Sequence, residues 1–198
     1  MLLASNNPGK VLEMRELLAD LPLELLTPDQ LNLQVDVEEN GTTYAENAVI
    51  KALAYARASR LLTLGDDSGL EVDLLGGLPG VRSARFSIKP GATDADRRAY
   101  LLQRLKPYPP PWLARFRCTI AVATPQDELY LTEGECPGEI IPIERGENGF
   151  GYDPIFLLPE LGLTMAELRP EEKNRLSHRA RAIQAARPLL TKLISSTG

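Results

Sequence analysis

The sequence has few of the residues from which disulfide frameworks and structural zinc sites are built. It contains two cysteines, Cys118 and Cys136, which form no CxxC pair, and a single histidine. A structural zinc site needs about four Cys or His ligands at short spacings, so neither a zinc site nor a disulfide framework is expected. This use of cysteine fits a reducing cytosol.

Positive charge and long hydrophobic runs are also scarce. The chain has 22 Lys and Arg against 27 Asp and Glu, a formal net charge of −5. Proteins that bind nucleic acid or anionic membranes in general carry a basic footprint, which this balance lacks. No uncharged apolar run reaches the roughly 18 residues of a membrane span, and the N-terminus does not resemble a signal peptide. We therefore expect a cytoplasmic protein that binds neither nucleic acid nor membranes.

The composition that remains is that of an ordinary globular protein. Of the 198 residues, 43% are hydrophobic and 25% are charged. Because domains commonly hold about 100–200 residues, residues 1–198 are predicted to form a single domain.

Short apolar segments alternate with helical patterns along the chain, which is typical of an α/β domain with a mixed sheet. Helices are predicted at Pro8–Asp20, Thr43–Leu61, Thr93–Leu105 and Lys173–Ile194. Strands are predicted at Leu2–Ser5, Leu33–Val37, Leu61–Leu64, Ala114–Val122, Glu128–Glu135, Gly138–Ile143 and Ile155–Leu158. The second helix opens with a capping box formed by Thr43 and Glu46.

The first motif is the run from Ser5 to Lys10, which follows a strand and opens a helix. Asn7 is a good N-cap, and Pro8 stands at the favoured first helical position. Lys10 opposes the helix dipole there, so it is either a solvated side chain or the partner of an anion such as phosphate. The run is not a Walker A loop, because Ala4 and Val11 stand where that motif needs Gly and Ser or Thr.

Carboxylates gather at two separate places. Residues 36–47 contain four acids and no Lys or Arg, which fits either solvated helix-start acids or a metal site. Asp66 and Asp67 follow the apolar strand Leu61–Leu64, at the strand end where ligands bind in α/β sheets. Hard oxygen donors favour Mg²⁺ over zinc.

Two C-terminal segments could contact a planar anionic ligand. The loop from Gly149 to Pro154 combines two aromatic residues, two glycines and an acid, a composition that suits ring stacking as well as a simple turn. Residues 167–187 carry six Arg or Lys against three Glu and include His178. Such a run is either a solvated helix face or a site for phosphate or an oxo-purine.

Taken in order, these motifs resemble those of the Ham1/inosine triphosphatase family of nucleotide pyrophosphatases along nearly the whole chain. The resemblance rests on SNNPGK, EENGTTYAENA, DDSGLEV, ARFRC, GFGYDPIF, EEK and SHRA. It implies an elongated α/β fold with a central mixed β-sheet flanked by helices and two lobes around a nucleotide-binding cleft. It also implies a homodimer that uses Mg²⁺ to split ITP, dITP and XTP into the monophosphate and pyrophosphate.

The same resemblance assigns roles to individual residues. Glu38 and Asp67 would hold the metal, although Glu39 is an alternative to Glu38, and Asp67 would also orient or deprotonate the attacking water. His178 and Arg179 would donate to the purine 6-oxo group. The remaining substrate contacts would come from Ser5, Asn6, Asn7, Pro8, Gly9 and Lys10 at the triphosphate, from Ser68 beside the catalytic acid, from Phe150, Gly151, Tyr152 and Asp153 at the base, and from Lys173.

Two other functions stay open from the sequence. A pyrophosphatase of the Maf type would act on pyrimidine or modified nucleotides and would be separated by comparing XTP with dTTP or UTP. A non-catalytic nucleotide-binding module would bind nucleotide but release no pyrophosphate.

Overall fold

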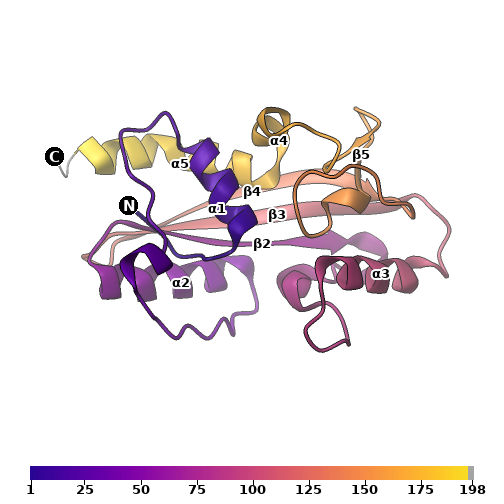
Figure 1. Ribbon diagram of the computed structural model, residues 1–198, viewed down its shortest axis with the longest axis horizontal. Coiled ribbons are helices and arrows are strands. Elements are labelled where there is room, and N and C mark those ends of the chain that lie inside the picture. The colour runs from indigo at the N-terminus through magenta and orange to yellow at the C-terminus, as the bar shows by residue number, and fades with distance from the viewer. Residues whose placement is uncertain (196–198) are drawn as a thin grey trace. The chain divides into compact units, whose positions relative to one another are not determined.

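The computed structural model describes residues 1–195 and contains five α-helices and six β-strands in that range (Figure 1). The helices are α1 (Pro8–Leu17), α2 (Tyr44–Ser59), α3 (Asp94–Leu105), α4 (Pro170–Leu176) and α5 (His178–Ser195). The strands are β1 (Leu2–Leu3), β2 (Thr63–Val72), β3 (Trp112–Ala123), β4 (Leu129–Ile140), β5 (Phe156–Leu158) and β6 (Leu163–Thr164). Within these residues, no helix combines the length and hydrophobicity that crossing a bilayer requires.

The six strands form one sheet in the order β1-β2-β3-β4-β5-β6. β1 runs parallel to β2, with Leu2 opposite Thr63, whereas β5 runs antiparallel to both β4 and β6. The sheet is therefore mixed, and helices flank it. This confirms the α/β class with a mixed sheet that the sequence predicts.

The chain divides into two compact units. The first comprises Met1–Asp67, Cys118–Gly134 and the segment from His178 on, and the second comprises Ser68–Arg117 and Glu135–Ser177. β2, β3 and β4 each contribute residues to both units.

In the first unit, helices cover both faces of the sheet (Figure 1). Alternate residues of β3 point to opposite faces, as the period-2 pattern predicts. One set, Cys118, Ile120 and Val122, packs with apolar residues of α1 and α5. The other set, Ala121 and Ala123, packs against the alanine face of α2. α2 can approach the sheet closely because Gly65 has no side chain. A β-carbon at this position would lie 2.2 Å from the carbonyl oxygen of Ala48.

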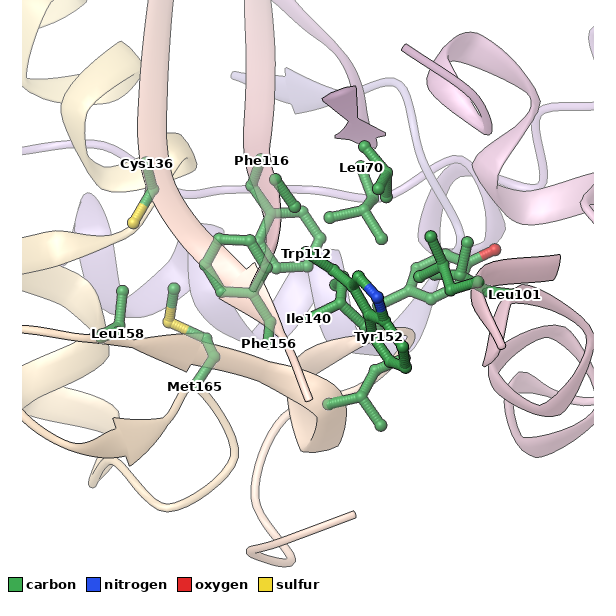
Figure 2. Close-up of a cluster of buried hydrophobic side chains, with 14 of the residues drawn as sticks. Leu70, Leu101, Trp112, Phe116, Cys136, Ile140, Tyr152, Phe156, Leu158 and Met165 are labelled. Carbon is green, nitrogen blue, oxygen red and sulfur yellow. The ribbon is translucent and has the colours of Figure 1, made fainter. Parts of the chain in front are cut away.

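The second unit has its own core, built around aromatic side chains (Figure 2). The rings of Phe116 and Phe156 pack against each other with their centroids 4.4 Å apart. Leu101 of α3 and Trp112 of β3 belong to the same buried cluster. Burial of large apolar side chains is the main source of stability for such a unit.

Several predicted elements differ from the structure. Leu33–Val37 alternates between half-buried and exposed residues as expected, but it forms neither helix nor strand. The strands predicted at Glu128–Glu135 and Gly138–Ile143 correspond to one strand, β4, which ends at Ile140 and leaves residues 141–143 outside it. The predicted closing helix is two helices, because Ser177 between α4 and α5 has extended backbone angles.

Candidate active site

Asp66 and Asp67 lie inside β2 rather than after its end, so the predicted strand boundary at Leu64 is wrong. The Gly-Asp-Asp-Ser-Gly segment has the composition of a turn, yet the strand continues through it to Val72. Neighbouring residues of a strand point to opposite faces of the sheet. The two adjacent carboxylates therefore face different helices and have different partners.

Asp66 is fully buried on the face covered by α1 and α5. Its carboxylate accepts hydrogen bonds from the Lys10 ammonium and from Nε of Arg179, the latter at 2.7 Å. The Cys118 thiol lies 3.5 Å from the same carboxylate. Burial alone would raise the pKa of Asp66, but Arg179 and Lys10 outweigh it and hold that pKa well below its usual range. Asp66 is thus an ionised group that holds two cations.

Arg179 is also fully buried, at the start of α5. Its guanidinium pairs with the carboxylate of Glu13 on α1 in addition to that of Asp66. Burial would lower the pKa of Arg179, but Asp66 and Glu13 raise it well above its ordinary value. The structure therefore joins Arg179 to two carboxylates, and its predicted contact with a purine 6-oxo group stays a prediction.

Asp67 points to the opposite face, toward α2. Its carboxylate accepts hydrogen bonds from Nδ2 of Asn47 at 3.3 Å and from Nζ of Lys51 at 3.4 Å. Burial raises the pKa of Asp67, Lys51 and Lys10 counteract this only in part, and Asp66 adds to the rise. Asp67 is therefore a better proton acceptor than an ordinary exposed aspartate.

Lys51 links Asp67 to an acidic loop residue. Its ammonium is 2.8 Å from Oε2 of Glu39, and its side chain is 10% exposed. Burial would lower the pKa of Lys51, but Asp67 and Glu39 raise it above its ordinary value. Lys51 is consequently a fixed cation beside Asp67.

Glu38, the predicted metal ligand, is exposed. Between residues 1 and 195, no cluster of three or more His, Cys, Asp or Glu side chains is placed to hold a metal ion. Glu39 is the acidic neighbour that reaches Asp67 indirectly, through Lys51.

The predicted phosphate loop, Ser5–Lys10, leads into α1 as expected. Asn7 caps the helix, its side chain accepting from the Lys10 backbone N–H at 3.1 Å, and Pro8 is the first helical residue. Asn6 donates to Asp29 at 2.8 Å. The Lys10 ammonium pairs with the Asp66 carboxylate, and the Lys10 side chain remains 15% exposed.

The predicted base loop lies in the second unit. Asp153 accepts hydrogen bonds from the Phe150 backbone N–H at 2.9 Å and from the Lys173 ammonium at 2.5 Å. The same ammonium lies 5.1 Å from the centre of the Phe150 ring. The Tyr152 hydroxyl is turned away from this group and donates to the Ser83 carbonyl oxygen at 2.9 Å. Phe150, Asp153 and Lys173 therefore form one cluster, whereas Tyr152 anchors the loop to its own core.

The last two predicted residues lie on β2 and α5. Ser68 is a half-buried residue of β2, one position after Asp67. His178 is the buried first residue of α5. β4 passes very close to the His178 backbone at Gly134, which has no side chain. A β-carbon on Gly134 would lie 2.1 Å from the His178 carbonyl oxygen.

The sequence interpretation missed the polar partners that hold these groups. Asn47 and Lys51 are spaced by four residues, so they lie on one face of α2, beside the alanine stripe. A lysine bordering a small-residue stripe was the available signal for Lys51. No local signal marks Glu13, whose partner Arg179 is 166 residues away.

The chain closely matches known proteins over nearly its full length. Residues 1–189 match the model of the Ham1 family. A Desulforamulus reducens protein named dITP/XTP pyrophosphatase is 46% identical over 194 residues, which cover 98% of this chain and 96% of that protein. A Geobacillus kaustophilus protein of the same name is 47% identical, over 92% of this chain and 90% of its own.

Solved structures give the same result for the fold. A HAM1 protein from Coxiella burnetii is 41% identical, with a TM-score of 0.86 over 96% of this chain and 98% of that one. The Ham1 protein of Staphylococcus aureus is 38% identical, with a TM-score of 0.82 over 100% of this chain and 98% of its own. The ordered motifs, the fold and these similarities agree, and the chain belongs to the Ham1 family.

Proposed function

We propose that residues 1–198 act as a single nucleotide pyrophosphatase domain that hydrolyses ITP, dITP and XTP to the monophosphate and pyrophosphate. The observation that carries this proposal is the contrast between Asp66 and Asp67. One carboxylate is ionised and holds Lys10, and the other has a raised pKa and faces Lys51. The relatives named dITP/XTP pyrophosphatase support the substrate class.

Asp67 is the proposed catalytic residue. Its carboxylate orients the attacking water and accepts its proton at an Oδ atom as the water oxygen bonds to the α-phosphorus and the bond from that phosphorus to the leaving pyrophosphate breaks. A carboxylate can act as a general base for a water that lies within hydrogen-bond reach of it. Lys51 and Asn47 keep the carboxylate in place through their hydrogen bonds.

Mg²⁺ is the proposed cofactor, and the donor set of the chain fits it. In nucleotide sites Mg²⁺ is held by one or two carboxylates together with substrate phosphates, and Asp67 with Glu38 or Glu39 supplies that chemistry. When bound, the ion neutralises the charge that spreads over the phosphate oxygens. The variants Glu38→Gln and Glu39→Gln separate the two candidates, since only loss of the true ligand raises the Mg²⁺ concentration needed for half-maximal rate.

The proposed substrate contacts fall into three groups. At the triphosphate, the Ser5–Lys10 loop offers the positive end of α1 and the Lys10 ammonium. At the base, Phe150 stacks, while Gly151, Tyr152, Asp153 and Lys173 build the pocket. Ser68, His178 and Arg179 complete the proposed contacts, the last two at the 6-oxo group.

The hydrogen-bond donors of His178 and Arg179 predict that the enzyme distinguishes nucleotides by the group at purine position 6. A 6-oxo purine presents an acceptor there, whereas adenine presents an amino donor that would face other donors. Leaving buried polar groups unpaired can lower the specificity constant by several orders of magnitude. ATP is therefore expected to be a poor substrate.

The proposal includes a homodimer that works in the cytoplasm and takes a purine nucleoside triphosphate, with neither nucleic acid nor membrane as partner. Light scattering coupled to size exclusion would give the mass in solution. A mass of one chain across the working concentration range would contradict the dimer.

The decisive experiment measures pyrophosphate and orthophosphate released from ITP, XTP, GTP, UTP and ATP at equal concentration, with Mg²⁺ and then with EDTA. We expect Mg²⁺-dependent pyrophosphate from ITP and XTP and little from ATP. Preference for UTP would favour the Maf-type alternative. Orthophosphate, or no product from any nucleotide, would refute the proposed reaction.

A further inference from the structure

One residue of the base loop, Gly151, is held by α3 through both of its backbone polar groups. The Gly151 N–H donates to Oδ2 of Asp94 at 2.8 Å, and Nη1 of Arg98 donates to the Gly151 carbonyl oxygen, also at 2.8 Å. Asp94 and Arg98 are four residues apart, so they lie on the same face of α3. One face of α3 thus satisfies both the N–H and the C=O of Gly151, and both hydrogen bonds involve a charged partner, which makes them strong.

The two α3 side chains are themselves held in place. Nε and Nη2 of Arg98 each donate to a carboxylate oxygen of Glu144 at 2.8 Å, a bidentate pair that fixes the plane of the guanidinium. Asp94 accepts from Nη2 of Arg97 at 2.5 Å, and the Arg98 side chain is only 12% exposed. The contact with Gly151 is therefore a defined clamp rather than a mobile surface interaction.

Gly151 lies between the loop residues that form the proposed base pocket. Its φ angle is +63°, a left-handed conformation that glycine adopts without a β-carbon penalty. Phe150 precedes it, and the Phe150 N–H donates to Asp153, which also accepts from Lys173. Fixing the Gly151 backbone consequently fixes where the Phe150 ring and the Asp153 carboxylate lie.

We propose that Asp94 and Arg98 are positioning residues for base recognition, acting on the substrate only through the backbone of Gly151. The inference rests on the proposed function, because it concerns the base end of that site. It predicts that loosening the clamp weakens nucleotide binding through the base while leaving the phosphate end and the hydrolytic step unchanged. Both residues lie in the second unit, whereas Lys10 and Asp67 belong to the first.

The test compares Arg98→Gln with Arg104→Gln. Arg104 is an exposed arginine of the same helix whose hydrogen bond goes to Tyr100 and not to the loop, so it controls for loss of a cation from α3. For Arg98→Gln we expect the KM for dITP to rise about tenfold with kcat within about twofold, the pattern of lost uniform binding. Inorganic tripolyphosphate carries no base, so its inhibition constant is expected to stay the same in both variants.

Asp94 provides a second comparison. Asp94→Ala removes the acceptor for the Gly151 N–H, whereas Asp94→Asn keeps a neutral one. The KM increase is expected to be larger in Asp94→Ala, and the asparagine variant should recover part of the loss. Amide hydrogen exchange of residues 149–153 supplies a readout that does not depend on activity, and it should be faster in Arg98→Gln than in Arg104→Gln.

Each outcome decides a different point. Equal KM values in Arg98→Gln and Arg104→Gln, or a tripolyphosphate inhibition constant that rises in step with the KM, would overturn the positioning role. Unchanged exchange at residues 149–153 would overturn the clamp itself. A wild-type enzyme that releases no pyrophosphate from dITP would instead refute the proposed function and the link of the clamp to base recognition.

Discussion

Two neighbouring aspartates on opposite faces of β2 have pKa values shifted in opposite directions. On one face, Asp66 is enclosed by Lys10 and Arg179 and has a lowered pKa. On the other, Asp67 meets Lys51 and has a raised pKa. Both carboxylates are desolvated, so burial does not distinguish them. The difference comes from how closely each is paired, because Asp66 has a hydrogen-bonded guanidinium that Asp67 lacks among its described partners.

This contrast separates a structural from a chemical use of the same side chain. A buried carboxylate that is fully paired costs little to keep ionised and is a poor base. One that is incompletely paired keeps its proton affinity, at some cost in stability. Substitutions on the two faces should therefore change different quantities.

The largest expected effect is on the rate, from Asp67→Asn. Asparagine keeps the shape of the side chain but cannot accept a proton, so kcat for pyrophosphate release should fall by about 10²- to 10⁴-fold. Thermal unfolding should show a melting temperature close to that of the wild type. Near-normal turnover would remove Asp67 from the mechanism.

Asp66→Asn should act mainly on stability. It leaves the buried Arg179 with only Glu13 as its described carboxylate partner, and breaking a buried charge network in this way typically costs about 3–5 kcal/mol. Urea unfolding measures the loss directly. A change in unfolding free energy below about 1 kcal/mol would show that the Asp66 face is not a tightly coupled network.

Lys10→Ala should weaken triphosphate binding. Asp66 keeps Arg179 as a partner in this variant, so the fold should survive. Loss of one cation at the phosphates should raise the KM about tenfold, with a smaller change in kcat. Lys192→Ala, an exposed lysine of α5, is the matched control. If both variants have wild-type KM and kcat, Lys10 is simply a capped-turn residue.

The smallest expected effect is on stability, from removing the N-cap of α2, the helix that carries Asn47 and Lys51. Thr43 caps α2, and its side chain accepts from the Glu46 N–H at 3.1 Å. Thr43→Ala should lower the unfolding free energy by about 1 kcal/mol. Thr191→Ala, in the last turns of α5, should be neutral or slightly stabilising because alanine is the better helix former. Equal effects would argue against a role for the cap.

Local signals predicted much of the fold. The Thr43 capping box, the Asn7 cap with Pro8 and the period-2 pattern of β3 each depend on neighbouring residues, and all three are present. The course of β2 could not be predicted in this way. Gly65, Asp66 and Asp67 favour a turn when considered alone, and only long-range partners such as Arg179 make an extended, buried conformation stable there.

The candidate site shows the same limit. Its residue types could be identified from motif order, but their pairing could not, because Lys10, Asp66 and Arg179 meet only in the folded chain. The sequence leaves Lys10 as either a solvated side chain or the partner of an anion such as phosphate. In the structure its ammonium pairs with the Asp66 carboxylate, and the phosphate contact stays a prediction. The link from Glu39 through Lys51 to Asp67 likewise depends on where α2 packs, which no local pattern specifies.

The placement of both carboxylates on one strand has an evolutionary consequence. Because side chains alternate with a period of two, inserting or deleting one residue in β2 before Asp66 would exchange the faces of the two aspartates at once. Substitutions in this strand can be absorbed singly, whereas a change of length cannot. Sequences that descend from a common ancestor with this chain are therefore expected to differ in length in loops such as residues 124–128, between β3 and β4, and to keep the spacing from Thr63 to Val72 fixed.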